Sequence, residues 1–184
     1  MRIVFITLSM SLDGYITGPD PGVEQPLGIG GDVVLRPGGD PSMVDEVLGK
    51  SGAVVAGRAM YDHVNGWGED PPFKMPVFVP THRPREVRVA GATTFTFVPD
   101  VETAIIQAKA AAGDKNVYIA GGASTADQAL QLGLVDELSI HIEPVLLGGG
   151  TRLFAEVGSG PIKLERMTLI EGPATTHLKF RVLR

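Results

Sequence analysis

The stretch VYIAGGASTADQAL, residues 117–130, constrains the fold of this chain more than any other segment. It opens with valine, tyrosine and isoleucine, which favour strands, whereas residues 126–130 favour a helix. Gly121 and Gly122 lie where the strand would turn into the helix. A direct passage from an apolar strand into a helix is typical of proteins that alternate strands and helices around a sheet.

Apolar runs of strand length recur along the chain and alternate with helical patterns. The runs cover residues 3–10, 53–56, 77–79, 94–98 and 117–120, and the helical patterns cover residues 41–50 and 100–113. This alternation predicts an α/β fold with a mostly parallel sheet buried on both faces. Three strand-like segments follow Asp136, with a tight connection at residues 171–173, so we expect antiparallel strands at the end of the chain.

Length and composition exclude several classes of protein. The chain has 184 residues, 43% of them hydrophobic, which predicts one domain over residues 1–184. Its formal net charge of -5 argues against binding to nucleic acid or to an anionic membrane surface. The absence of cysteine excludes disulfides and fits a cytoplasmic location. The N-terminal segment is interpreted as a buried strand, not as a signal sequence or a membrane span. The four histidines lack the spacing of metal ligands, so no metal site is predicted.

The turn at Gly121 and Gly122 is a candidate anion site. A helix that starts there presents unpaired backbone N–H groups and partial positive charge, both of which suit a phosphate. The alternative is that the glycines only permit a tight turn and that Ser124 or Thr125 caps the helix with its side chain. The motif by itself leaves both interpretations open.

Two further turns carry groups that bind phosphate. In AVVAGRAMYD, Gly57 and Arg58 follow an apolar run, and the guanidinium can hold a phosphate by two hydrogen bonds. The segment VFVPTHRPR offers a hydroxyl, an imidazole and two cations, on Thr81, His82, Arg83 and Arg85, although a hydrated basic turn is the alternative. The spacing matches neither the G-x-G-x-x-G pattern of a Rossmann unit nor the G-K-[ST] of a P-loop.

Residues 18–41 form a long segment rich in glycine and proline. Because this segment directly follows the first strand, we expect it to fold over a site at the strand ends. A mobile surface excursion is the alternative, since long loops in compact domains are either functional or mobile.

Four segments together carry a family resemblance: SLDGYITG, VVAGRAMYD, VYIAGGAS and LVDELSIHIEPVLLGGGTRLF. In this order they resemble the dihydrofolate reductase-like superfamily, and most of all the branch with the reductase domain of the bifunctional riboflavin-biosynthesis deaminase/reductase. The resemblance covers nearly the whole chain. It implies a three-layer α/β/α fold with a central, mostly parallel sheet that ends in antiparallel strands.

The resemblance also implies an NADPH-dependent reductase and assigns parts of the cofactor to particular residues. The pyrophosphate would lie against Gly121, Gly122, Ala123, Ser124 and Thr125, and the second helix start would add Gly57, Arg58 and Ala59. The 2'-phosphate would fall to Thr81, His82 and Arg83, and the nicotinamide to Leu8, Ser9 and Ile16. Hydride transfer needs such placement because its rate depends on the distance and orientation of the ring and the acceptor.

The sequence offers two candidates for proton transfer to a substrate. Asp13 is the first, and its alternative role is a hydrogen bond that closes the turn before Gly14. His141 is the second, and its alternative is a buried, hydrogen-bonded imidazole. Trp67 either lines the cleft or fills the core.

Folate is not the expected substrate. In dihydrofolate reductase a carboxylate on the first helix binds the pteridine, whereas the corresponding region here offers Asp40, Asp45 and Glu46 without a clear equivalent. The Pro-Trp pair that follows the first loop in those enzymes is replaced by glycine-rich sequence around residues 28–30.

Two functions therefore compete. One is an NADPH-dependent reductase that acts on a small heterocyclic substrate, pterin- or riboflavin-precursor-like, or on a carbonyl substrate. The other is a nucleotide-binding module that keeps the fold without turnover.

Relatives in the branch commonly form homodimers, and the final segment ATTHLKFRVLR has one apolar face that either the monomer or a second copy must cover.

Overall fold

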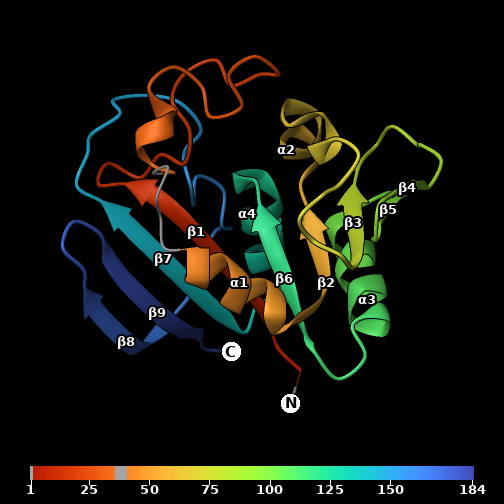
Figure 1. Ribbon diagram of the computed structural model, residues 1–184. Coiled ribbons are helices and arrows are strands. Elements are labelled where there is room, and N and C mark those ends of the chain that lie inside the picture. Colours follow the sequence, from red (N-terminus) through yellow and green to blue (C-terminus); the bar gives the residue numbers. More distant parts are fainter. Residues whose placement is uncertain (1, 36–40) are drawn as a thin grey trace.

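The computed structural model describes residues 2–35 and 41–184, and a single sheet runs through its centre (Figure 1). The strands are β1 (Val4–Ser11), β2 (Ser51–Ala56), β3 (Pro76–Pro80), β4 (Arg88–Ala90), β5 (Thr93–Val98), β6 (Asn116–Gly121), β7 (Glu137–Glu143), β8 (Leu164–Glu171) and β9 (Thr176–Val182). The helices are α1 (Pro41–Gly49), α2 (Arg58–His63), α3 (Val101–Ala111) and α4 (Ala123–Gln131), with short 3-10 helices at Gly31–Val33 and Asn65–Trp67. Across the sheet the strand order is β4-β5-β3-β2-β6-β1-β7-β9-β8.

Most of the sheet is parallel, as the sequence predicts. β1 pairs in parallel with β6 and β7, β2 with β6 and β3, and β3 with β5. The C-terminal strands are antiparallel, since β9 pairs with β7 and β8 pairs with β9. The carboxyl ends of the parallel strands therefore lie together along one side of the sheet, called here the carboxyl edge, where loops and helix starts gather. The sequence does not predict β4, because a three-residue strand that begins with arginine has no apolar run.

Helices cover both faces of the sheet, which gives the three layers (Figure 1). Successive side chains in a strand point to opposite faces, so each strand contributes to two cores. Ile6 and Val55 are fully buried in a cluster with Ile105 of α3, whereas Val54 is fully buried in a second cluster with Tyr61 of α2. The three-layer α/β/α fold that the sequence suggests is confirmed.

Two helices begin as local sequence patterns predict. α1 occupies residues 41–49 of the predicted 41–50 helix. Asp100 caps α3, because its carboxylate accepts the Thr103 backbone N–H at 2.7 Å, and Gly113 follows the helix with a φ of 60°. Within the described residues, every helix is too short or too polar to cross a membrane.

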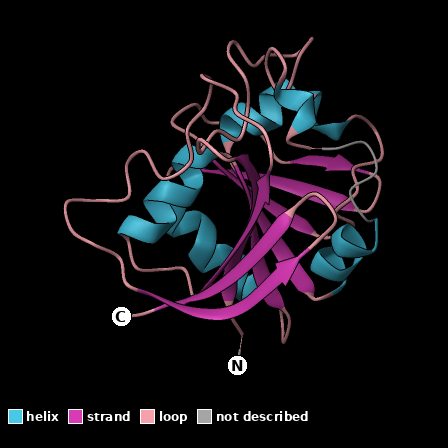
Figure 2. Ribbon diagram, turned by 90° about the vertical axis from the view of Figure 1, so that its left-hand side faces the viewer, coloured by secondary structure: helices cyan, strands magenta, loops and turns pink. Residues whose placement is uncertain are grey.

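The C-terminal hairpin of β8 and β9 forms one edge of the sheet, and Figure 2 brings this edge to the front. β8 is the outermost strand and every residue along it is exposed. Its large apolar side chains, Leu164, Met167, Leu169 and Ile170, are between 37% and 56% exposed. β8 is therefore an edge strand in which four exposed apolar side chains alternate irregularly with polar and charged ones, and soluble proteins usually protect exposed apolar groups on an edge strand.

Candidate functional site

Two glycine turns meet at the carboxyl edge of the sheet. The backbone N–H of Gly57, just after β2, donates to the carbonyl of Gly121 at the end of β6, 2.5 Å away. A Cβ atom on Gly57 would lie 2.7 Å from both the Gly122 nitrogen and Thr125 Oγ1, so a larger residue does not fit without displacement. The peptide bond between Gly121 and Gly122 is cis. The two turns therefore form one continuous backbone surface, named here the glycine surface (residues 57, 121 and 122).

The N-terminus of α4 opens onto the glycine surface. Its N-cap residue is Gly122, which has no side chain to accept a backbone N–H. Ser124 lies inside the helix, where its hydroxyl accepts the Gln128 amide at 3.0 Å, and Thr125 is buried. The interpretation of Ser124 or Thr125 as the capping residue is therefore wrong. A Cβ atom on Gly122 would contact nothing within 4 Å, so there is free space beside the helix start.

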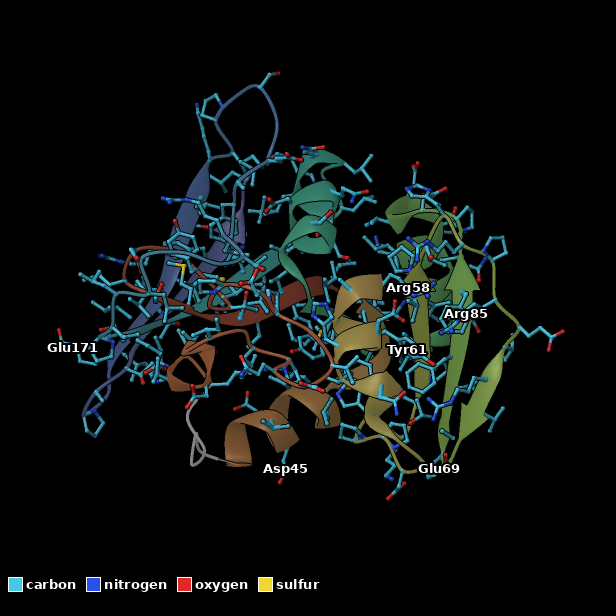
Figure 3. All side chains as sticks on the ribbon, turned by 90° about the horizontal axis from the view of Figure 1, so that it is seen from above. Asp45, Arg58, Tyr61, Glu69, Arg85 and Glu171 are labelled. Atoms are coloured by element: carbon cyan, nitrogen blue, oxygen red, sulfur yellow. The ribbon has the colours of Figure 1, made fainter. Side chains whose placement is uncertain are left out.

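Arg58 connects the glycine surface to the loop after β3. Its Nη1 donates to Thr81 Oγ1 at 3.0 Å, and its Nε pairs with Asp62 at 2.8 Å. The Arg58 side chain is only 19% exposed, so these two contacts fix the guanidinium in place. Figure 3 looks onto the carboxyl edge of the sheet and shows Arg58 close to Arg85. The Nη1 of Arg85 lies 3.9 Å from the Asp62 carboxylate.

The loop after β3 holds the other predicted phosphate-binding residues. The Thr81 N–H donates to the Val98 carbonyl at 2.7 Å, and Thr81 Oγ1 accepts the Arg83 N–H at 3.1 Å. His82 and Arg83 are exposed. The Thr103 N–H lowers the pKa of the Asp100 carboxyl, and the positive charge of His82 lowers it further, which places His82 near the start of α3. The Arg83 guanidinium and the His82 imidazole therefore extend beyond the end of β3, on the same side of the sheet as the glycine surface.

The end of β1 lies next to the glycine surface. Leu8 Cδ2 is 3.3 Å from the position that a Cβ atom on Gly121 would take. Ser9 is in register with His141 on the neighbouring strand β7, so both side chains point to the α1 face of the sheet. Ile16 packs against the opposite core, and its N–H donates to the Thr151 carbonyl at 2.9 Å. Leu8 therefore lies next to the predicted pyrophosphate turn, and Ser9 lies beside His141 of β7.

Asp13 fastens a glycine-rich loop to the end of β1. Its carboxylate accepts the Ser11 hydroxyl at 2.5 Å and the backbone N–H groups of Leu147 and Gly148 at 3.1 and 2.8 Å. These hydrogen bonds, that of Ser11 first, lower the pKa of Asp13 to about 2. The contacts are those of a turn-closing carboxylate, so they favour a positioning role for Asp13, and proton transfer by this residue stays a prediction.

His141 pairs with a second histidine. Its Nδ1 lies 2.7 Å from Nδ1 of His177, the residue directly across from it on β9. Burial, together with the nearby His177, lowers the pKa of His141 to about 4. The buried Nε2 of His141 has no hydrogen-bond partner among the described residues. His141 is therefore a neutral imidazole with Nδ1 engaged and with Nε2 enclosed by the protein without a partner among the described residues.

Glu143 and His177 are two polar residues of this region that the sequence reasoning misses. Glu143 is 5% exposed, and each of its carboxylate oxygens lies 2.9 Å from the Thr175 hydroxyl, which donates to them. The alternation in ELSIHIE, residues 137–143, already places Glu143 on the same face as His141. His177 becomes visible only with the register of β9 against β7, because the two histidines are far apart in the sequence.

The described part of the loop at residues 18–41 packs closely onto its surroundings. A Cβ atom on Gly18 would lie 1.9 Å from the Ile29 carbonyl oxygen, and one on Gly150 would lie 2.0 Å from the Thr17 carbonyl oxygen. The first approach lies within the loop, and the second joins the start of the loop to the segment that Asp13 also holds. Residues 36–40 lie outside the described residues, and the expected covering role of the loop stays a prediction.

The carboxylates of α1 do not form a binding group of the kind that folate needs. Asp45 and Glu46 are exposed, and Figure 3 shows Asp45 on the outer side of α1. Glu46 instead pairs with Lys50 at 2.9 Å, which lowers the pKa of its carboxyl. Asp40 lies outside the described residues. Trp67 belongs to the core, since its ring packs against Tyr61, Phe73 and Phe95.

Comparison with known proteins gives one family match. The family model described as the RibD C-terminal domain matches residues 2–176. Over 168 residues the chain is 26% identical to the uncharacterized protein YyaP of Bacillus subtilis (strain 168), a match that covers 85% of this chain and 82% of YyaP.

Solved structures share the whole fold. The putative riboflavin biosynthesis protein from Shewanella sp. PV-4 is 25% identical with a TM-score of 0.78, and the match covers 100% of both chains. Dihydrofolate reductase from Enterococcus faecalis, solved in complex with NADP(H), is 16% identical with a TM-score of 0.63, and the match covers 98% of this chain and 96% of that one. The likeness to the second structure shows the fold alone, and it confirms the predicted dihydrofolate reductase-like architecture.

Proposed function

Because the chain belongs to the RibD C-terminal domain family, we propose that it is an NADPH-dependent reductase that transfers a hydride to a small heterocyclic or carbonyl substrate. The single observation that carries this proposal is the contact between Gly57 and Gly121, which joins two glycine turns at the carboxyl edge of a parallel sheet. Ligands of open α/β sheets bind at this edge.

The residues around the glycine surface fit a phosphorylated dinucleotide. The start of α4 offers backbone N–H groups and free space beside Gly122, which suits a pyrophosphate. Arg58, held by Thr81 and Asp62, adds a fixed cation at the same edge. We assign the 2'-phosphate to Thr81, His82 and Arg83, and the nicotinamide to Leu8, Ser9 and Ile16. When bound, the cofactor would supply the hydride, and the protein would position it.

The substrate is proposed to be a riboflavin-precursor-like or pterin-like heterocycle other than folate. The exposed positions of Asp45 and Glu46 support the exclusion of folate, because neither carboxylate is available to hold a pteridine. The α1 face of β7 and β9 instead presents the imidazoles of His141 and His177 and the carboxylate of Glu143, and the Thr175 hydroxyl lies against Glu143 just before β9 begins. A heterocycle with both hydrogen-bond donors and acceptors matches this set.

Titration with NADPH and NADP⁺ tests the proposal. A nucleotide at about 100 times its dissociation constant should raise the free energy of unfolding by about 2.7 kcal/mol, measured as a thermal shift. The oxidation of NADPH is then followed with a panel that contains dihydrofolate, a dihydropterin, a riboflavin-precursor pyrimidine and simple aldehydes. No shift with either nucleotide would reject the reductase. A shift without oxidation over the panel would favour the alternative, a nucleotide-binding module without turnover.

We further propose that the protein is a homodimer in the cytoplasm. The uncovered apolar edge of β8, with Ile170 56% exposed, supports a second copy as its cover. A chain without cysteine is consistent with a reducing compartment.

A further inference from the structure

His141 and His177 are held together by the register of two antiparallel strands. They are directly opposite on β7 and β9, and their Nδ1 atoms are 2.7 Å apart. At this distance one Nδ1 must carry a proton and donate, and the other must accept, because two N–H groups or two lone pairs would repel. The pair therefore shares one proton between two imidazoles.

The environment of each ring indicates which one donates. Burial holds the pKa of His141 at about 4, so this imidazole is neutral near pH 7. His177 lies on the outer side of the pair, where its Nε2 is 3.4 Å from the position of a Cβ atom on Gly172 in the β8–β9 turn. His177 is the ring nearer to the β8 edge of the sheet, so the relay proposed below assigns the donated Nδ1–H to it. A neutral His141 that accepts at Nδ1 carries its own proton on Nε2.

The Nε2 of His141 is buried and lacks a hydrogen-bond partner among the described residues. Buried polar atoms without a partner are rare, and each of them calls for an explanation such as a ligand or a catalytic role. The two nitrogens point out of the imidazole ring in widely different directions, so Nε2 points away from β9. The neighbour on that side of β7 is β1, where Ser9 is in register with His141 and belongs to the proposed nicotinamide site.

Few charged groups face the pair from the strands around it. Glu143 is two residues further along β7 and is engaged by the Thr175 hydroxyl. Lys179 is two residues further along β9 and pairs with Glu137 at 2.7 Å. On this side of the sheet α1 contributes Asp45 and Glu46, both exposed, and β1 contributes the uncharged Ser9. Among these groups, therefore, no adjacent unpaired carboxylate takes up the proton that the two histidines share.

We propose that His141 and His177 form a proton relay that protonates the substrate, an inference that rests on the reductase function proposed above. When bound, the nicotinamide cofactor would supply a hydride to the carbon of a C=N or C=O bond, and the role of His141 Nε2 is to give the proton to the heteroatom. In the same step His141 Nδ1 takes the shared proton from His177 and His177 Nε2 takes a proton from solvent, so that neither ring becomes an imidazolate. The sum is one hydride and one solvent proton added to the substrate, with both imidazoles neutral at the end. After product release, water that enters the emptied site gives a proton to His141 Nε2, the shared proton returns to His177 Nδ1, and His177 Nε2 releases a proton to solvent, which restores the starting tautomers.

The tautomers give a test that needs no substrate. Nitrogen-15 NMR of the labelled protein distinguishes the protonated ring nitrogen of each histidine, and the His141→Gln variant assigns the His141 signals. We expect His141 to be neutral with its proton on Nε2 at pH 7. A proton on Nδ1 of His141, donated to His177, would overturn the relay, whether or not the protein is a reductase.

Single-turnover kinetics give the second test, with a substrate from the panel that the wild-type protein reduces. His141→Gln keeps a hydrogen-bonding side chain but cannot transfer a proton, so we expect a rate about 100-fold lower with the NADPH affinity unchanged. His177→Gln should also lower the rate, and added imidazole should partly restore it. His63→Gln, on α2, is the matched control and should keep the wild-type rate. Wild-type rates in both His141→Gln and His177→Gln would refute the relay while leaving the reductase intact. If the wild type reduces nothing in the panel, the proposed reductase function is rejected. The NMR measurement of the tautomers then tests by itself whether His177 donates a proton to His141.

Discussion

Gly57 donates its backbone N–H to the carbonyl of Gly121 at 2.5 Å, and this contact joins the turn after β2 to the turn after β6. The approach is this close because neither residue has a side chain, and a Cβ atom on Gly57 would lie 2.7 Å from the Gly122 nitrogen and from Thr125 Oγ1 of α4. The candidate pyrophosphate site thus depends on two glycines that are far apart in the sequence. Its geometry is set by packing between the turns.

Replacement of Gly57 by alanine should disrupt this packing. The added methyl group must displace Gly122 or Thr125, and such overpacking costs about 1–3 kcal/mol of folding free energy. We expect a lower urea midpoint together with weaker NADPH binding. Gly49→Ala is the control, because its Cβ atom would contact nothing within 4 Å. Unchanged stability and NADPH affinity in Gly57→Ala would contradict the close packing.

Replacement of Arg83 by alanine should reduce the preference for NADPH over NADH. The guanidinium can form charge-assisted hydrogen bonds with the 2'-phosphate, a group that NADH lacks. Fluorescence titration should show a loss of about 10-fold or more in NADPH affinity, equivalent to about 1.4 kcal/mol, with little change for NADH. Arg166→Ala on the exposed strand β8 serves as the control. Equal losses for both nucleotides would remove Arg83 from this role.

The hydrogen bonds of Asp13 make its contribution to stability dependent on pH. The folded-state pKa is about 2, below the ordinary 3.8, so the folded state favours the ionised carboxylate. The contribution is therefore fully present above about pH 4 and is lost as the pH falls through about 2. Asp13→Asn should be less stable than the wild type at pH 7, and this difference in urea midpoint should shrink towards pH 2. An equal difference at both pH values, or a similar effect of Asp32→Asn at an exposed position of the 3-10 helix Gly31–Val33, would count against this role of the carboxylate.

The exposed edge of β8 predicts a dimer in solution. Size exclusion with light scattering should give a mass of twice 19.4 kDa at micromolar concentration. A lysine in place of Ile170 adds charge to the edge and should produce the monomer. The same change at Val89, which is 70% exposed on the edge strand β4 at the other end of the sheet, should leave the dimer intact. A wild-type mass of 19.4 kDa would exclude the stable dimer without affecting the cofactor site.

Local patterns in the sequence were sufficient to predict most of the elements. The apolar run at residues 3–10 became β1, Asp100 caps α3 as expected, and the connection at residues 171–173 joins an antiparallel hairpin. These features depend on neighbouring residues, because strand propensity, capping and turns are short-range properties. The resemblance of four motifs was sufficient to identify the fold.

The relations between distant residues were decided only by the tertiary structure. The sequence places β8 before β9, yet β9 lies between β7 and β8, and this order brings His177 against His141. The Arg58 contact with Thr81 likewise depends on β2 and β3 lying side by side. Strand order and register are set by which faces the whole sheet must bury, and a shift of one residue would turn His141 to the opposite face. The sequence alone therefore determined the parts of the candidate site, whereas the packing of the complete sheet decided which of those parts meet.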